Sequence, residues 1–328
     1  MFHRAGGPYQ DAHGHDWPDN AERFALLGWA GACLGIGADP LWRPDVVHAH
    51  DWHAGLAPLY LQRLAGANPQ PATVFTVHNL AYQGLFGRET LGALGLPESL
   101  YRFDGVEFHN HGSFMKAGLQ FADAITTVSP RYAREIMTPE QGCGMDGLLR
   151  HRADRVSGIL NGVDYDVWNP ADDPMVGSGF DQGRMAGKAA AKQALQRQVG
   201  LEERTDGLLF GAVSRLSDQK GLHLLPGVLD DLVASGGQLA VLGSGEAGIE
   251  AALAEAVHRY PRQESLRKGY DEALAHRIIA AADVLLVPSR YEPCGLTQLY
   301  ALRYGALPLV HAVGGLADTV TDCSPAAL

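Results

Sequence analysis

The chain has 328 residues, 46% hydrophobic and 19% charged, which is ordinary for a globular protein and long enough for two domains of typical size. Its 26 basic and 37 acidic residues leave a formal charge of −11, which repels a polyphosphate backbone, so we expect no nucleic-acid partner. No apolar run reaches the ~18–20 residues that span a bilayer, and the four cysteines are scattered without a CxxC pair. We therefore expect a soluble, cytoplasmic protein with no membrane partner.

The first half of the chain predicts parallel α/β units, because short runs rich in valine and isoleucine alternate with longer amphipathic stretches. We expect helices at 55–64 and 114–122, and strands at 44–47, 72–77, 124–128 and 156–160. Polar sequences follow these strands, among them HAHDWH, HNLAYQG and NGVD. Ligands of parallel sheets bind at the carboxyl ends of strands, so these loops are candidate binding loops.

The second half repeats the pattern after an irregular connection at 164–183, which is dense in Asp, Pro and Gly. We expect strands at 208–213, 239–242, 284–287 and 307–310, and helices at 188–199, 222–235, 249–260 and 296–304. The sequence thus predicts an α/β protein of two Rossmann-like domains, residues 1–164 and 165–328, that face an interdomain cleft.

The sequence SRLSDQKG places Arg215 and Lys220 in one loop after a predicted strand. Two cations there could grip a diphosphate, the arginine through its forked donors and the lysine as a point charge. Two solvated surface charges are the alternative interpretation.

The sequence SRYEPCGLT places Glu292 between a predicted strand and a helix that begins near Leu296. Free amides at the start of that helix favour a phosphate. The carboxylate could hold sugar hydroxyls or stabilise positive charge on a sugar ring, although a simple helix cap is the alternative. Cys294 has the position of a low-pKa nucleophile, but no partner histidine is nearby, which favours packing.

The sequence HAHDWH gathers His48, His50, Asp51 and His53, residue types that can bind zinc. The dinuclear hydrolase pattern HxHxDH needs its aspartate where Trp52 stands, so we expect no metal. GSGE at 243–246 is not GxGxxG, and there is no GxxxxGK[ST] loop, so neither a nicotinamide fingerprint nor a P-loop is present.

The whole set of motifs resembles the bacterial glycogen synthase and plant starch synthase family. The matching sequences occur in the family's order: RFALLGW, RPDVVHAHDWHAGLAP, VFTVHNLAYQG, ILNGVD, VSRLSDQKGL, SRYEPCGLTQLY and GGLADTV. The resemblance implies the two-domain GT-B fold and a retaining glucosyltransferase. It implies ADP-glucose as donor, the non-reducing end of an α-1,4-glucan as acceptor, and no metal or other cofactor.

The resemblance also implies roles for individual residues. Asp51 and His78 would line the sugar side from the first domain, with His78 on the transferred glucose. Arg215 and Lys220 would bind the leaving diphosphate, and Glu292 would contact the glucose near the reacting carbon. The expected substrate-binding residues are Asn161, Tyr270 (against the nucleotide base), Cys294, Gly295, Leu296 and Thr297. Related transferases carry two glutamates as Ex7E, whereas here Tyr300 stands at the second position.

Two family features are missing from the sequence. The amino-terminal KxGGL loop is absent, and the chain stops before the closing helices. We therefore expect a fragment that lacks both termini, binds ADP-glucose weakly and transfers little glucose. A related GT-B transferase with another nucleotide sugar, or a non-catalytic glucan-binding remnant, are the competing hypotheses.

Overall fold

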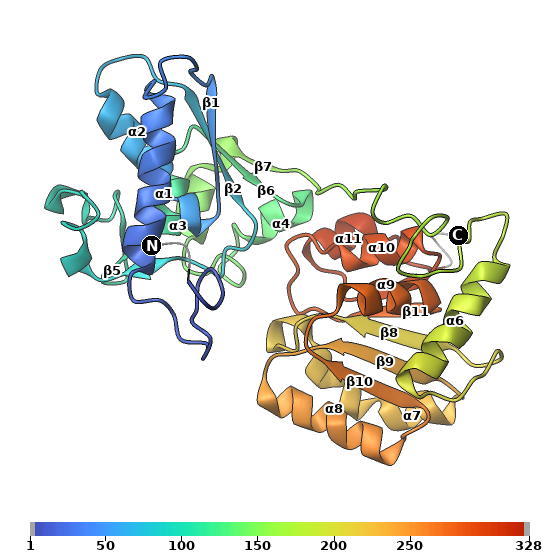
Figure 1. Ribbon diagram of the computed structural model, residues 1–328. Helices are drawn as coiled ribbons and strands as arrows, with labels where there is room; N and C mark the ends of the chain where they lie inside the picture. The colour runs from blue at the N-terminus through green and yellow to red at the C-terminus, as the bar shows by residue number, and fades with distance from the viewer. Residues whose placement is uncertain (1–3, 325–328) are drawn as a thin grey trace. The chain divides into compact units, whose positions relative to one another are not determined.

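The computed structural model describes residues 4–324, so the outermost residues of both predicted domains lie outside the described part (Figure 1). The chain divides into two compact units between Leu160 and Asn161. The two units fall close to the predicted domains, whose acceptor-side and nucleotide-sugar-binding roles stay predictions.

The first unit is built on a parallel sheet of order β1-β2-β6-β7, with the strands Val46–His50, Ala72–Val77, Ala124–Thr127 and Val156–Gly158. A small antiparallel sheet of order β3-β5-β4 adds Leu85–Phe86, His111–Ser113 and Glu107–Phe108. The α-helices are α1 Asn20–Gly35, α2 Ala57–Ala65, α3 Phe114–Phe121, α4 Pro130–Glu135 and α5 Asp146–His151. Short 3-10 helices are η1 Trp52–Ala54, η2 Arg88–Thr90, η3 Glu98–Leu100 and η4 Ala153–Arg155.

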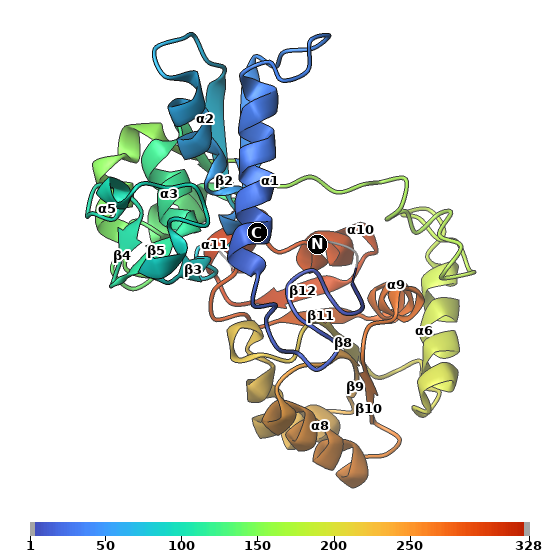
Figure 2. The same ribbon diagram turned by 60° about the vertical axis from the view of Figure 1, so that its left-hand side comes forward.

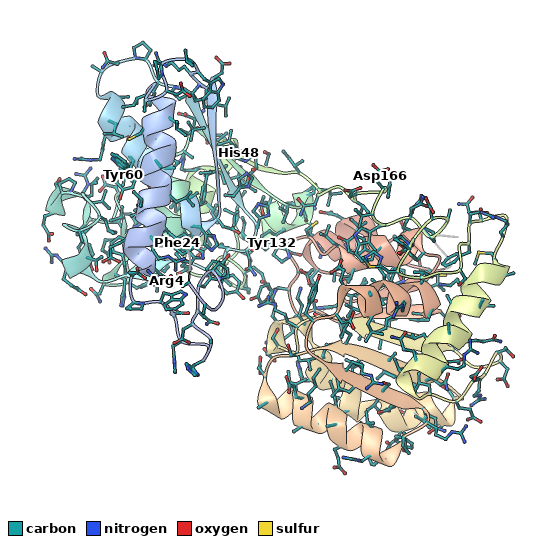
Figure 3. All side chains as sticks on the ribbon, viewed as in Figure 1. Arg4, Phe24, His48, Tyr60, Tyr132 and Asp166 are labelled. Carbon is teal, nitrogen blue, oxygen red and sulfur yellow. The ribbon has the colours of Figure 1, made fainter. Side chains whose placement is uncertain are left out.

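Two apolar clusters stabilise the first unit. One joins α1 and α2, where the side chains of Phe24 and Tyr60 both lie (Figure 3). The other packs Phe75 and Ile125 of the sheet against Met115 of α3. These sheet residues point to the same side, because side chains alternate along a strand and neighbouring strands are in register.

The second unit is built on a parallel sheet of order β10-β9-β8-β11-β12, with the strands Glu264–Lys268, Gln238–Gly243, Leu209–Val213, Val284–Val287 and Leu307–Val310. Its α-helices are α6 Ala186–Val199, α7 Leu229–Ala234, α8 Ala247–Arg259, α9 Glu272–Ala281, α10 Thr297–Arg303 and α11 Gly314–Thr319. The 3-10 helices η5 Asp218–Lys220 and η6 Leu222–Gly227 complete it.

The second sheet is covered on both faces, with α7 and α8 on one side and α6 and α9 on the other (Figures 1 and 2). Strand β9 shows why, since every one of its residues is buried and apolar side chains point both ways. Leu239 and Val241 pack in the cluster with α8, whereas Ala240 and Leu242 pack in the cluster with α6 and α9. This layered arrangement brings the carboxyl ends of all the strands to one edge.

Several predicted elements need correction. The strand predicted at 44–47 is β1 at Val46–His50, so the first half of HAHDWH, His48 to His50, lies inside the strand rather than after it. The single helix predicted at 222–235 is divided into η6 and α7, because Pro226 has no amide hydrogen and interrupts the helix. The strand predicted at 156–160 is shorter, Val156–Gly158.

Other elements were missed. No sequence pattern predicted α1, α4, α5, α11 or the small antiparallel sheet, and β10 and α9 were not predicted either. The irregular connection predicted at 164–183 is confirmed, because residues 159–185 contain no helix or strand. Among the described residues, no helix is long and apolar enough to cross a membrane.

Candidate functional site

The loops after β8 and β11 meet, because these strands are parallel neighbours in the second sheet. The first loop carries Arg215 and Lys220, and the second carries Glu292. The Nζ atom of Lys220 donates to Oε2 of Glu292 over 2.6 Å, across 72 residues of sequence. The structure therefore brings together the predicted diphosphate cation and the predicted sugar carboxylate.

Glu292 is only 6% exposed, so its carboxylate needs partners. Besides Lys220, the hydroxyl of Ser289 donates to the same Oε2 over 2.9 Å. Both contacts fix one oxygen of the carboxylate. Ser289 was not predicted, and its position three residues before Glu292 was the available signal.

Gly221 allows the two loops to approach closely. It has φ +71°, and a Cβ atom there would lie 2.0 Å from the carbonyl oxygen of Pro288. A main-chain hydrogen bond from the amide of Arg290 to the oxygen of Gln219, 2.9 Å, joins the loops directly. The glycine next to Lys220 is thus required for the contact between the loops.

The turn from Glu292 to α10 is shaped by Gln298, a residue that the sequence analysis missed. Its buried amide group donates to the carbonyl oxygens of Cys294 and Gly295, over 3.1 and 2.9 Å. Its Oε1 atom is buried and has no hydrogen-bond partner among the described residues. Gly295 adopts φ +70°, a conformation that glycine accepts without strain, and the predicted Leu296 and Thr297 follow it into α10.

The thiol of Cys294 is buried. Burial raises its pKa, although the nearby Asn161 works in the opposite direction. A raised pKa favours the neutral thiol, so the structure supports packing rather than nucleophilic attack for Cys294. It also places the predicted Asn161 beside this turn.

Tyr270 and Arg215 lie open to solvent in the second unit. Tyr270 is 84% exposed, which leaves the face of its ring available for stacking. Asp271, next to it, caps α9 by accepting from the amide of Leu274 over 2.9 Å. Arg215 is exposed just beyond β8.

In the first unit, Asp51 and His78 lie together at the ends of β1 and β2. The carboxylate of Asp51 accepts from the amides of His78 and Asn79, over 2.7 and 3.3 Å. Asp51 adopts φ +54°, which is strained for an aspartate, so its surroundings hold it there. Such strain is found most often at functional sites.

The ring of His78 is held from the side by His50, whose Nδ1 lies 3.0 Å from Nε2 of His78. A hydrogen bond between them requires one ring to donate and the other to accept. Burial lowers the pKa of His50, and its neighbours His48 and His78 lower it further. His50 therefore favours the neutral state, in which its ring can either donate or accept in this contact.

The histidines of HAHDWH point to separate partners rather than to one centre. His48 lies 2.6 Å from the hydroxyl of Thr76, and the ring of His53 stacks on Tyr9 and contacts Trp52 at a tilt. In the part of the chain that the structure describes, no group of three His, Cys, Asp or Glu side chains could hold a metal.

The second parallel sheet carries Arg215, Lys220 and Glu292 on strand-end loops, and the first carries Asp51 and His78. Two such α/β units define the GT-B class of glycosyltransferases. Residues 1–151 match the family model described as the starch synthase catalytic domain, and residues 195–327 match glycosyl transferases group 1.

Individual relatives point to the same family as the two family models. The glycogen synthase of Albidiferax ferrireducens is 61% identical over 99% of this chain and 66% of its own length. That of Rhodopseudomonas palustris is 56% identical over 99% of this chain and 67% of its own length. The catalytic domain of starch synthase IV from Arabidopsis thaliana, solved with ADP and acarbose, has a TM-score of 0.87 and 35% identity, over 94% of this chain and 64% of that one.

The chain belongs to the glycogen synthase family. It spans about two thirds of the length of the curated relatives it matches, 66% of the first two. The predicted family and fold class are confirmed.

Proposed function

We propose that this chain carries the reaction centre of a retaining glucosyltransferase that moves glucose from ADP-glucose to the non-reducing end of an α-1,4-glucan. The observation that carries the proposal is the contact between Lys220 and the buried Glu292. It joins a cation suited to a leaving diphosphate with a carboxylate suited to a sugar. The solved Arabidopsis relative binds ADP and acarbose, which supports a nucleotide and a glucan-like ligand for this family.

Departure of ADP develops negative charge on the diphosphate. Lys220 and Arg215 lie on the loop that follows β8 and can neutralise that charge without a metal ion. Arg215 can bind two phosphate oxygens at once, whereas Lys220 acts as a point charge. Lys220 is held at its position by Glu292 before any ligand binds.

The sugar side of the reaction develops positive charge at the reacting carbon. Glu292 would stabilise that charge and hold glucose hydroxyls, with Ser289 keeping its carboxylate oriented. Retention of configuration follows if a short-lived oxocarbenium-like ion pair is attacked from the face that the diphosphate leaves. Tyr270 would stack on the nucleotide base, and the turn at Gly295 would bring the amides of Leu296 and Thr297 toward phosphate.

The first unit would supply the sugar-binding groups. The main-chain contact from His78 to Asp51 orients the start of HNLAYQG, and the ring of His78 would contact the transferred glucose. Asn161, beside Cys294, would lie on the substrate side of the turn. We likewise propose a cytoplasmic location, which suits four free cysteines that form no disulfide.

The test measures transfer of labelled glucose from ADP-glucose to glycogen. It is run on the chain alone and on the chain joined to the remaining sequence of the Albidiferax ferrireducens relative. We expect ADP binding by the chain and transfer by the fusion. Strong preference for UDP-glucose would instead show another GT-B transferase. Binding to glycogen without transfer in either form would show a glucan-binding protein and contradict the proposal.

A further inference from the structure

Asp173 is a buried carboxylate that no proposed step uses. Its side chain is 1% exposed and belongs to the irregular segment before α6. One oxygen accepts from the hydroxyl of Tyr304 over 2.6 Å and contacts Nδ1 of His276 over 2.7 Å. The other accepts from the amide of Met175 over 2.9 Å. Burial alone would raise the pKa of Asp173, but the hydrogen bonds from Tyr304 and His276 hold it below the ordinary value.

Trp168, from the same segment, stacks between two helices. Its ring lies 3.7 Å from that of Tyr300 on α10, with an interplanar angle of 7°. On its other side it lies 3.8 Å from the ring of His276 on α9, at 14°. The same histidine thus contacts both Trp168 and Asp173.

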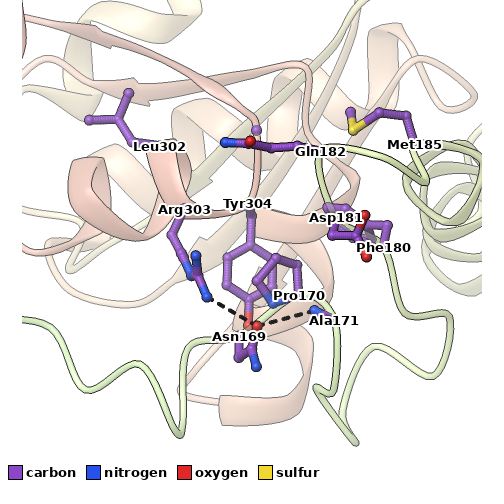
Figure 4. Close-up of a pocket in the computed structure, with 11 residues that line it drawn as sticks. Asn169, Pro170, Ala171, Phe180, Asp181, Gln182, Met185, Leu302, Arg303 and Tyr304 are labelled. Carbon is purple, nitrogen blue, oxygen red and sulfur yellow. Dashed lines mark hydrogen bonds between the residues drawn. The ribbon is translucent and has the colours of Figure 1, made fainter.

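Further polar contacts join this segment to the same helices. Asn169 accepts from Arg303 at the end of α10 over 3.2 Å and from the amide of Ala171 over 3.3 Å (Figure 4). The side chain of Arg277 on α9 donates to the carbonyl oxygen of Met175 over 2.7 Å. We call residues 168–175 the brace, because they contact both α9 and α10.

These two helices follow the loops of the proposed nucleotide-sugar site. Tyr270 stands just before α9, and Glu292 with its turn stands before α10. A rigid contact between the helices therefore fixes the distance between the two loops. A buried carboxylate whose two oxygens both have hydrogen-bond partners specifies one geometry, which apolar packing alone does less strictly.

We propose that the brace, through Asp173 and Trp168, is a positioning element that sets the nucleotide-binding loop at Tyr270 against the Glu292 turn. This inference rests on the proposed function. It adds residues outside the site that tune affinity for the nucleotide sugar. None of them touches substrate.

The main test is Asp173→Asn, which keeps the side chain's shape but replaces one acceptor oxygen by a donor. Tyr304→Phe removes only the hydroxyl that donates to Asp173. The matched control is Asp283→Asn. Asp283 is likewise a carboxylate with two hydrogen-bond donors in this unit, Lys192 over 2.6 Å and the amide of Leu209 over 2.7 Å. It lies just before β11, at the amino-terminal ends of the strands, whereas the proposed site lies at their carboxyl ends.

The substitution removes a charge-assisted hydrogen bond that holds the brace, so we expect Asp173→Asn to raise the Kd for ADP about tenfold or more. In the fusion, KM for ADP-glucose should rise by a similar factor while kcat changes little. Amide hydrogen exchange should become faster at 271–276 and 297–300. Tyr304→Phe should show smaller changes of the same kind, and Asp283→Asn should lower Tm with an unchanged Kd.

The proposal is wrong if Asp173→Asn and Tyr304→Phe lower Tm yet leave both the Kd and the exchange at these helix starts unchanged. Hydrogen exchange needs no nucleotide, so it tests the positioning role of the brace independently of the proposed function. Absence of ADP binding in the unsubstituted chain would contradict the proposed function, whereas local loosening in Asp173→Asn would still show that the brace holds the two loops.

Discussion

At the scale of single residues, the ion pair between Lys220 and the buried Glu292 holds together the two side chains proposed to contact the diphosphate and the sugar. Their types and their places after strands identify them as candidates for diphosphate and sugar binding. Their contact could not be predicted, because it depends on β8 and β11 being neighbours, and strand order is a tertiary property. Ser289 and Gln298 were missed although their contacts are local, because only the folded turn shows which groups they hold.

Lys220→Ala should lower transfer about ten- to a hundredfold, because a charge-assisted contact with the leaving group is worth about 1.5–3 kcal/mol. The fold should persist, since Ser289 still donates to Glu292. The measurements are kcat/KM for ADP-glucose in the fusion and Tm of the same preparation.

The control for Lys220→Ala is Arg290→Ala. Arg290 pairs with Asp218 across the same two loops, but both side chains are exposed. An exposed ion pair contributes little, so turnover should change by less than about threefold. Equal losses in the two variants would mean that Lys220 acts only by joining the loops.

At the scale of elements, apolar strands were predictable and polar ones were not. The predicted strands at 72–77, 284–287 and 307–310 are confirmed with the same bounds, because each is a short apolar run. Strand β10 reads ESLRK, which lacks a hydrophobic run because it pairs with β9 alone among the described strands. Helix α9, which follows β10 in the chain, was not predicted either.

Strand β10 contains an unusual acid. Glu264 is 3% exposed, and its Oε1 atom has no hydrogen-bond partner among the described residues. Burial raises the pKa of Glu264 from 4.5 to about 7. The carboxyl group of Glu264 therefore binds its proton more tightly in the folded chain than in the unfolded chain. Its contribution to stability is full below pH 4.5 and is lost as the pH rises through about 7.

Glu264→Gln should remove this pH dependence. We expect a higher Tm than the unsubstituted chain at pH 8, where the buried charge costs on the order of 3 kcal/mol, and a small difference at pH 4.5. Thermal unfolding across this pH range measures the effect. Glu203→Gln is the control, because Glu203 forms an exposed pair with Arg197, and its Tm should change little at any pH. A parallel pH profile in the two variants would contradict the assignment.

At the scale of the whole molecule, the candidate groups are divided between the units. Asp51 and His78 lie in the first, and the groups proposed for ADP lie in the second. His78→Ala should therefore leave the Kd for ADP within about twofold while it lowers transfer at least about tenfold, the loss expected for one sugar contact. Calorimetry with ADP and the transfer assay, on one preparation of the fusion, give the two values. A parallel loss of both would show that His78 supports the nucleotide.

The brace also determines where this chain can be recombined with a relative. Each of the five apolar clusters among the described residues lies within one unit, two in the first and three in the second, so a crossover at residue 160 divides none of them. A crossover at residue 171, in equally irregular chain, would take Trp168 from one parent and Asp173 from the other. Chimeras joined at 160 should inherit the second parent's nucleotide affinity intact. Chimeras joined at 171 should keep that affinity only where the two parents have the same residues at the brace. A crossover inside this loop would therefore disrupt the second unit even though the loop contains no helix or strand.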